Sequence, residues 1–432
     1  MYWNKKMETM KLKEREKLQL KRLKSVVARC AKIDFYKKRF KEAGFKPSEI
    51  KTLKDITKIP FTVKTDLRDT YPFGMFAAPM KDIVEIHASS GTTGKPIVVG
   101  YTKNDIENVW SETMARAYTS AGVTAKDIVQ NAYGYGLFTG GLGFHYGAIK
   151  VGATVVPTAT GNTERQIMLM QDFGTTVLCC TPSYALYIAD EMKRLGVDFS
   201  KLKLRIGFFG AEPWSEKMRS EIQERLHINA FDMYGLTEII GPGVAAECEE
   251  KCGLHVYDDH YIVEVIDPET LEPVVPGEKG ELVFTTVTKE GFPVLRYRTR
   301  DLSILYTDKC ACGRTHPRIA RISGRSDDML KIRGVNVFPS QVESVALEIP
   351  GLEPYYQIIV DRQDNLDQIE VQVEMSQEAY SKKEIKEPEL KKKLSEKLQS
   401  VLQIKADVTL LAPNTLPRTE GKAKRVIDKR KF

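Results

Sequence analysis

The stretch Ile83-Val-Glu-Ile-His-Ala-Ser-Ser-Gly-Thr-Thr-Gly-Lys-Pro96 joins a short apolar run to a loop rich in glycine and hydroxyl residues. It predicts a strand over residues 83–86 with a tight loop after it. Working outward, similar apolar runs recur at residues 97–99, 153–156, 176–179 and 206–209, with helical stretches at 103–121 and 164–173. Strands that alternate with helices predict an α/β fold whose parallel sheets are covered by helices.

The chain changes character twice after residue 255. Between about residues 255 and 320, β-rich segments at 261–266, 280–286 and 294–297 are separated by Pro/Gly turns, which predicts a barrel-like antiparallel subdomain. After Gly324 the pattern is a helix at 340–348, strands at 356–360 and 368–374, a helix at 381–401 and a strand at 406–411. This order predicts a small α+β domain. We therefore expect a large N-terminal domain over residues 1–326 and a small C-terminal domain over residues 327–432.

The net charge of +7 is unevenly distributed along the 432 residues. Residues 1–30 carry ten Lys/Arg and three Asp/Glu, residues 418–432 carry seven bases and two acids, and residues 31–417 sum to −5. A nucleic-acid-binding protein would place its basic excess on the body of a domain, so this distribution argues against that class. Periodic apolar residues predict one amphipathic helix over residues 7–45. Its interleaved Glu residues favour a helix docked on the body over a contact with an anionic membrane.

Targeting signals are missing from the sequence. No apolar run approaches the roughly 18–20 residues that span a bilayer, and the basic N-terminus lacks the apolar segment of a secretory signal. These features favour the cytoplasm. Its reducing conditions would keep the seven cysteines as thiols or metal ligands.

Residues 248–316 hold four of the seven cysteines and three of the six histidines. The order Cys310-Ala-Cys312-Gly313 is typical of a zinc knuckle, and a structural Zn²⁺ takes four S or N ligands in a tetrahedron. We expect a structural zinc site made of Cys248, His255, Cys310 and Cys312. Cys252 is an alternative ligand, and four free thiols are the alternative to any metal.

The loop after the first strand has the composition of a phosphate-binding loop, with Ser89, Ser90, Gly91, Thr92, Thr93, Gly94 and Lys95 in succession. Glycine lets backbone N–H groups close around phosphate oxygens, the hydroxyls add donors and the lysine adds positive charge. Because Pro96 follows the lysine, the loop is not a Walker A motif. A flexible Ser/Gly connector is the alternative.

Four further motifs follow in order: Tyr234-Gly-Leu-Thr-Glu238, Arg296-Tyr-Arg-Thr-Arg-Asp301, Gly324-Arg-Ser-Asp-Asp328 and Gly421-Lys422. In this order, over nearly the whole chain, they resemble the adenylate-forming superfamily of acyl-CoA synthetases, peptide-synthetase adenylation domains and luciferases. Residues 321–341 resemble the signature of the phenylacetate–CoA ligase family nearly word for word. The resemblance implies a ligase that uses ATP to turn an aryl acid, phenylacetate above all, into an acyl-adenylate. The acyl group then passes to coenzyme A, and pyrophosphate and AMP are released.

The resemblance also implies roles for individual residues. Glu238 binds Mg²⁺, and Asp301 accepts hydrogen bonds from the ribose hydroxyls. Lys422 is the catalytic lysine, with Lys424 as the alternative, and it meets the oxygen that bridges the α-phosphate and the substrate carboxylate. Asp327 is the hinge about which the small domain turns between the half-reactions. The other nucleotide-binding residues, besides the loop 89–95, are Gly210, Ala211, Glu212, Pro213, Asp232, Tyr234, Gly235, Thr237 and Arg325.

The acid-binding residues are less specific. Tyr133, Tyr135 and Phe138 alternate with glycines in a loop after a strand, which suits the wall of an aryl-acid pocket, and core packing is the alternative. Two other functions stay open. One is an adenylating enzyme with a non-CoA acceptor, such as the relative that adenylates a deazaflavin cofactor, and the other is a non-catalytic nucleotide-binding homologue. The expected partners are small molecules and a second copy of the chain in a homodimer, with no nucleic acid and no membrane.

Overall fold

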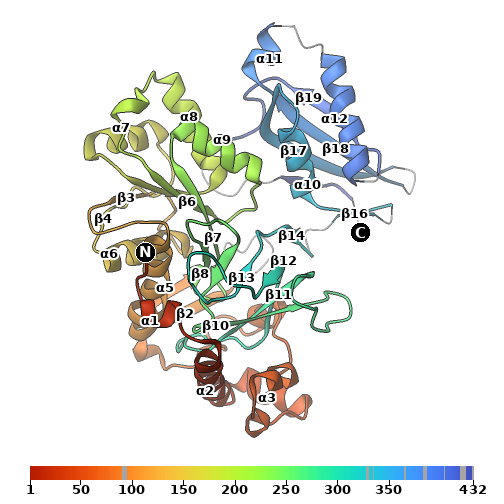
Figure 1. Ribbon diagram of the computed structural model, residues 1–432. Coiled ribbons are helices and arrows are strands. Elements are labelled where there is room, and N and C mark those ends of the chain that lie inside the picture. The colour runs from red at the N-terminus through yellow and green to blue at the C-terminus, as the bar shows by residue number, and fades with distance from the viewer. Residues whose placement is uncertain are drawn as a thin grey trace. The chain divides into compact units, whose positions relative to one another are not determined.

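The computed structural model describes residues 1–89, 95–326, 330–333, 335–363, 366–382, 387–402, 404–418 and 425–430. The chain forms two compact units (Figure 1). The large unit comprises Met1–Cys180, Asp198–Ala211 and Asn229–Arg321, and the small unit comprises Thr181–Val197, Glu212–Ile228 and Ile322–Phe432. Within the residues described, none of the helices is long and apolar enough to cross a membrane.

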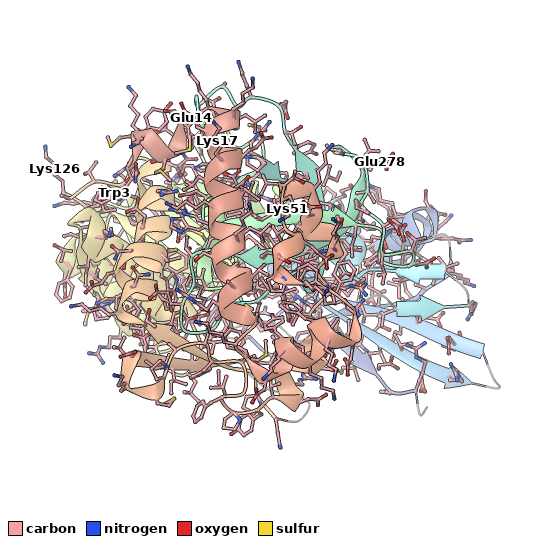
Figure 2. The ribbon with its side chains drawn as sticks, turned by 90° about the horizontal axis from the view of Figure 1, so that it is seen from below. Trp3, Glu14, Lys17, Lys51, Lys126 and Glu278 are labelled. Carbon is pink, nitrogen blue, oxygen red and sulfur yellow. The ribbon has the colours of Figure 1, made fainter. Side chains whose placement is uncertain are left out.

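The N-terminal segment does not form the single helix that we expected over residues 7–45. It forms three helices, α1 (Lys5–Glu8), α2 (Leu12–Cys30) and α3 (Asp34–Glu42). Asp34 lies in the first turn of α3, where the helix dipole favours an acidic side chain. The break between α2 and α3 lets Tyr36 and Phe40 reach the core, where they are 1% and 4% exposed. In Figure 2, Glu14 and Lys17 lie on the exposed side of α2.

The strands of the large unit form one mixed sheet in the order β10-β11-β12-β13-β9-β8-β7-β6-β5-β3-β4, and β1 pairs with β2 apart from it. Neighbouring strands among β4, β3, β5, β6 and β7 pair in parallel. Along the rest of the sheet, from β7 through β8, β9, β13, β12 and β11 to β10, neighbouring strands are antiparallel. The α/β fold is therefore confirmed. The β-rich segment, with strands β10 to β13, is antiparallel and belongs to the same hydrogen-bonded sheet. The bounds are β1 (Ile83–Ala88), β2 (Val98–Thr102), β3 (Ile128–Asn131), β4 (Thr154–Val156), β5 (Val177–Cys180), β6 (Ile206–Gly210), β7 (Asn229–Leu236), β8 (Gly241–Glu247), β9 (Leu254–Val256), β10 (Tyr261–Ile266), β11 (Lys279–Thr286), β12 (Tyr297–Tyr306) and β13 (Arg318–Ile319).

Helices α5 (Ser111–Ser120) and α6 (Gly140–Val151) pack against each other and against β8. Nearly every residue of α5 is buried, which fits a helix inside the domain rather than on its surface. The remaining helices and turns are η1 (Pro47–Glu49), η2 (Leu53–Lys58), α4 (Lys64–Asp69), η3 (Met80–Asp82), the π-helical η4 (Asp105–Trp110), α7 (Thr163–Phe173) and η5 (Phe199–Lys201).

The small unit contains a four-stranded sheet in the order β19-β18-β17-β20 and the hairpin β15–β16. Its helices α10 and α12 pack on each other, on β17 and on β19. Leu390, Leu394, Leu398 and Leu402 recur every four residues along α12 and fill an aliphatic core. The bounds are α8 (Pro182–Arg194), α9 (Glu216–Leu226), β14 (Gly324–Arg325), β15 (Leu330–Ile332), β16 (Val335–Val337), α10 (Pro339–Leu347), β17 (Leu352–Gln363), β18 (Leu366–Met375), α11 (Gln377–Lys382), α12 (Glu387–Leu402), β19 (Asp407–Leu411) and β20 (Val426–Asp428).

Candidate active site and metal cluster

Two of the sequence motifs meet in the large unit. Tyr234 lies in β7 and Asp301 in β12, and the Tyr234 hydroxyl donates to Asp301 Oδ2 at 2.6 Å. Both side chains are 8% exposed. The Tyr234 ring stacks on Phe284, with ring centroids 6.0 Å apart. The residues that sequence reasoning assigns to adenine and to ribose therefore lie in direct contact.

Asp232 lies on the same strand as Tyr234. Its carboxylate forms an ion pair with Arg321, with Nε 3.4 Å from Oδ2. Its backbone N–H donates to the Glu247 carboxylate at 2.7 Å. Asp232 is thus an anchored carboxylate at the end of the parallel strands, the edge at which open α/β sheets bind their ligands.

The turn between β7 and β8 carries Thr237 and Glu238, which are 5% and 7% exposed. Thr237 Oγ1 lies 3.3 Å from Thr139 Oγ1. The hairpin is tight: a Cβ on Gly235 would lie 2.0 Å from the Gly241 carbonyl oxygen, so a side chain there cannot fit. A carboxylate with hydroxyl oxygens beside it is the kind of hard donor set that Mg²⁺ takes together with water, so these residues fit the metal.

Sequence reasoning missed a buried lysine at this turn. Lys289 is 0% exposed, and its Nζ donates to the Ile239 carbonyl at 2.8 Å. The ammonium lies over the Tyr101 ring, 4.4 Å from its centroid. Burial lowers the pKa of Lys289 to about 7, against the pull of Asp105 and Glu238, which raise it. The surrounding Thr-Lys-Glu-Gly reads as an ordinary solvated turn, so the sequence carries no signal for this contact.

The glycine-rich loop is described only at its base. Ser89 and Ile97 close the base with two hydrogen bonds, Ser89 N to Ile97 O at 2.9 Å and Ile97 N to Ser89 Oγ at 3.0 Å. Lys95 Nζ lies 5.5 Å from the centroid of the Tyr71 ring. Ser90, Gly91, Thr92, Thr93 and Gly94 lie outside the described residues, as do Asp327 and Lys422.

The run of residues 210–213 spans the two units. Gly210 ends β6, and Ala211 after it has a left-handed backbone with φ +70°. Glu212 and Pro213 belong to the small unit, where Glu212 Oε1 accepts a hydrogen bond from Ser183 N at 2.8 Å. Arg325 lies in β14, half-buried.

The three predicted aromatic residues differ in their surroundings. Tyr133 is buried, stacks on Phe144 with centroids 4.9 Å apart and donates to the Gly210 carbonyl at 3.4 Å. The Tyr135 hydroxyl lies 3.2 Å from His145 Nδ1. Phe138 is 37% exposed. Tyr133 is therefore placed like a core residue, whereas Phe138 has a free face.

The four predicted metal ligands come together. One potential ligand atom each from Cys248, His255, Cys310 and Cys312 lies within 4.8 Å of all the others. Cys248 Sγ is 3.7 Å from Cys310 Sγ, and Cys312 Sγ is 3.4 Å from His255 Nε2. Zn–S bonds of about 2.3 Å put tetrahedral ligands roughly 3.8 Å apart, so the three sulfurs and one imidazole fit Zn²⁺. Exposed Cys252 is outside this group, although its sulfur is 3.4 Å from Cys310 Sγ.

The residues after Cys312 bind the start of the chain. Arg314 Nε donates to Glu8 Oε2 at 2.7 Å, and Thr315 N donates to the Glu8 carbonyl at 3.0 Å. The Tyr2 hydroxyl donates to the Cys312 carbonyl at 2.7 Å. The segment next to the cluster therefore holds α1 on the large unit.

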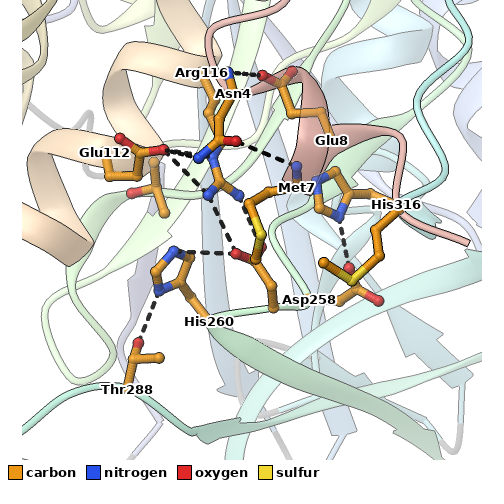
Figure 3. Close-up of polar contacts among 12 residues, drawn as sticks. Asn4, Met7, Glu8, Glu112, Arg116, Asp258, His260, Thr288 and His316 are labelled. Carbon is orange, nitrogen blue, oxygen red and sulfur yellow. Dashed lines mark hydrogen bonds and ion pairs between the residues drawn. The ribbon is translucent and has the colours of Figure 1, made fainter. Parts of the chain in front are cut away.

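Buried charges continue this contact to α5 (Figure 3), and Arg15 of α2 pairs with Asp258 at 3.4 Å. Arg116 Nη1 lies 2.8 Å from Asp259 Oδ1, with both side chains 1% exposed, and Arg116 Nη2 lies 3.3 Å from Glu112 Oε1. His316 Nδ1 lies 2.6 Å from Asp258 Oδ1. We refer to Glu8, Arg15, Gln19, Glu112, Arg116, Asp258, Asp259, His260, Arg314 and His316 as the N-terminal corner.

Comparison with known proteins places the chain in a family. Residues 12–288 match the model of the AMP-binding enzyme family, and residues 334–430 match that of the AMP-binding enzyme C-terminal domain. Phenylacetate-coenzyme A ligase of Thermus thermophilus is 48% identical over 100% of both chains. The enzyme of that name from Escherichia coli K12 is 48% identical over 98% of this chain and 97% of its own.

A solved structure of 2-hydroxyisobutyryl-CoA ligase, in the postadenylation state with 2-HIB-AMP, matches with a TM-score of 0.94 and 30% identity. The match covers 99% of this chain and 92% of that one. With full-length relatives near half identity and both family models matched in order, the chain belongs to the phenylacetate–CoA ligase family of adenylate-forming enzymes.

Proposed function

We propose that this chain is an ATP-dependent acid–thiol ligase that activates an aryl acid, with phenylacetate favoured, and transfers it to coenzyme A. The acid is adenylated with release of pyrophosphate, and the thiol then displaces AMP. The observation that carries the proposal is the 2.6 Å hydrogen bond between Tyr234 and Asp301, which joins the two motifs assigned to the nucleoside. Identity of about half to phenylacetate-coenzyme A ligases over the whole chain supports the choice of acid.

The nucleotide would lie along the ends of β6, β7 and β12. Tyr234, Asp232 and residues 210–213 would contact adenine, and Asp301 and Arg325 the ribose side. Thr237 and the loop 89–95 would contact phosphate. Glu238 would hold Mg²⁺, which supplies positive charge to the phosphates when bound. Since adenylation brings a carboxylate up to a polyanion, these groups act by neutralising charge and by positioning.

Lys422 would stabilise the charge that develops on the oxygen between the α-phosphate and the carboxylate. Residues 327–432 would form a domain that turns at Asp327 between the half-reactions and removes this lysine before the thiol enters. The Lys422→Ala variant should lose adenylation while keeping thioester formation from supplied acyl-adenylate. Lys424→Ala is the matched control and should keep both. Equal loss of both steps in Lys422→Ala would contradict the domain alternation.

A pyrophosphate-release assay over aryl and fatty acids, with and without CoA, tests the function itself. Phenylacetate should give the highest rate, and thioester should accumulate only when CoA is present. Pyrophosphate release without any use of CoA would indicate a different acceptor, and no turnover with any acid would indicate a non-catalytic homologue. Phe138→Ala should change the KM for the acid and leave the KM for ATP unchanged if Phe138 lines the acid pocket, together with Tyr133 and Tyr135.

We also propose a structural Zn²⁺ at Cys248, His255, Cys310 and Cys312. The support is the donor set and its spacing: a Sγ–Sγ distance of 3.7 Å is far too long for a disulfide and close to a tetrahedral edge. The hydrogen bond between Cys248 and Cys312 lowers the pKa of the Cys312 thiol and raises that of Cys248, which favours one thiolate of the kind that a metal needs. The metal would fix the turn from which Arg314 and Thr315 hold the N-terminus.

Elemental analysis of fresh protein tests the zinc site, with about one zinc per chain expected. Cys312→Ser should lose the metal, whereas Cys252→Ser should retain it, and buried Cys30→Ser serves as a control away from the cluster. Chelation should also speed hydrogen exchange in residues 1–20, because Glu8 and Arg15 bind the segment after Cys312. If fresh protein contained no zinc and chelation left hydrogen exchange in residues 1–20 unchanged, the zinc proposal would be wrong. Light scattering tests the homodimer that the family resemblance implies. The expected location of the protein is the cytoplasm.

A further inference from the structure

The turn that carries Glu238 is held by buried side-chain donors from three other segments. Lys289 Nζ donates to the carbonyl of Ile239 at 2.8 Å, directly after Glu238. The Tyr101 hydroxyl donates to the next carbonyl, that of Ile240, at 3.0 Å. Trp110 Nε1 donates to the carbonyl of Pro242 at 2.9 Å. Three carbonyls within four residues are thereby fixed by groups that no water reaches.

Lys289 differs from the other two donors because its amine can carry a positive charge, although burial lowers its pKa to about 7. An ammonium in a buried site costs free energy unless it gains strong partners. Here its partners are one carbonyl, the faces of Tyr101 at 4.4 Å and Phe292 at 5.3 Å, and the fields of Asp105 and Glu238. Methionine would fill the same space without a donor, so the hydrogen bond to the Ile239 carbonyl is what links Lys289 to the turn.

The backbone that presents Lys289 is itself fixed. Asp105 accepts hydrogen bonds from Glu290 N at 2.6 Å, from Gly291 N at 2.7 Å and from Thr102 N at 3.0 Å. Asp105 is 0% exposed, so these bonds are protected from water. The ammonium therefore reaches the turn from a rigid base.

We infer that Lys289 is a positioning residue for the Mg²⁺–ATP half-reaction, which fixes the turn bearing Thr237 and Glu238 and adds positive charge behind it. This inference rests on the proposed function. It assigns Lys289 no contact with the substrates. Because only adenylation uses Mg²⁺ and ATP, losing the lysine should affect that half-reaction and spare thioester formation.

The test compares Lys289→Met with the wild-type chain in the two half-reactions. A charged hydrogen bond of this kind corresponds to a change of about tenfold to a hundredfold. Lys289→Met should therefore raise the KM for Mg²⁺–ATP in pyrophosphate release by at least about tenfold, with the KM for CoA unchanged. Thioester formation from supplied acyl-adenylate should keep the wild-type rate. Lys289→Arg, which retains the charge, should recover most of the loss.

Controls separate positioning from mere folding. Tyr101→Phe removes the neighbouring donor and should shift the same KM by a smaller factor. Tyr118→Phe removes an equally buried hydroxyl, bonded to the Phe144 carbonyl at 3.1 Å, and should shift nothing. If Lys289→Met does not accumulate as folded protein, Lys289→Gln takes its place under the same criteria. An unchanged KM for Mg²⁺–ATP, or an equal loss in both half-reactions, overturns the inference. If the wild-type chain releases pyrophosphate, the proposed function holds and only the inference about Lys289 fails.

Discussion

The N-terminal corner of the large unit is packed with ionised side chains, whereas the core of the small unit is aliphatic. In the corner Arg116, Asp258 and Asp259 are almost fully buried, and each has an oppositely charged partner within 3.4 Å. In the small unit, Leu394, Leu398 and Val371 are 0% exposed, and two acids are buried: Glu374, which pairs with Arg418 at 2.7 Å, and Glu343. The corner should therefore depend on charge pairing, and the small unit on shape and on keeping one carboxyl neutral.

Removing a charge from the corner should have the largest effect on stability. Arg116→Met leaves Asp259 and Glu112 buried with one partner fewer, which should lower the free energy of unfolding by about 3–5 kcal/mol. Denaturant unfolding measures the change. Lys38→Met, which breaks an ion pair to Glu42 between side chains 80% and 57% exposed, should cost about 0.5 kcal/mol or less. Equal costs for the two variants would show that burial does not set the value of these pairs.

Deleting volume from the small unit should have a somewhat smaller effect. Leu394→Ala should cost about 2–4 kcal/mol, because it removes apolar contacts and leaves a cavity in a core of leucines and valines. Hydrogen exchange in α12 and β18 locates the loss. Val401→Ala on the same helix is the matched control, since Val401 is 45% exposed, and it should cost less than about 0.5 kcal/mol.

The aliphatic core was predictable from the sequence, but the charged corner was not. The α+β pattern after Gly324 predicted a helix at 381–401, and the structure has α11 and α12 there. The strand predicted at 261–266 is β10, from Tyr261 to Ile266. The strand predicted at 294–297 instead runs from Tyr297 to Tyr306 as β12, because Arg298 and Asp301 are buried and paired there rather than solvated.

The candidate site also contains both residues that the sequence predicted and residues that it did not. Spacing and donor chemistry predicted the four residues of the Cys/His cluster, which the structure brings together. Lys289 and Arg116 gave no signal, because the value of a charged residue depends on partners far along the chain: Ile239 is 50 positions from Lys289, and Asp259 is 143 from Arg116. Residue type alone assigns such side chains to the surface.

Acid should weaken the corner through His260. Burial lowers the pKa of His260 to about 4, although Asp259, 3.3 Å away, raises it. The folded state thus binds the proton less readily than the unfolded state, whose pKa is near 6.5. The stability that this provides is present above about pH 6.5 and is lost as the pH falls towards 4, at up to about 1.4 kcal/mol per pH unit. Hydrogen exchange in β10 and α5 should show this slope, and His260→Gln should remove it.

Glu343 should make the stability of the small unit depend on pH in the opposite direction. Burial raises the pKa of Glu343 to about 7, against a usual value of 4.5, even though Arg425 and Tyr356 favour its ionised form. Its contribution is therefore fully present below about pH 4.5 and is lost as the pH rises through 7. Glu343→Gln should flatten the pH dependence of exchange in α10 and β17 and leave that of the corner unchanged.

Because the two windows overlap between about pH 4.5 and 6.5, the opposite slopes should nearly cancel in a measurement of the whole chain. The single variants should therefore reveal what the wild-type chain hides. His260→Gln should lose stability as the pH rises, and Glu343→Gln as it falls. The double variant should return to a flat profile. If both single variants lost stability in the same direction of pH, the opposite pKa shifts assigned to His260 and Glu343 would be wrong.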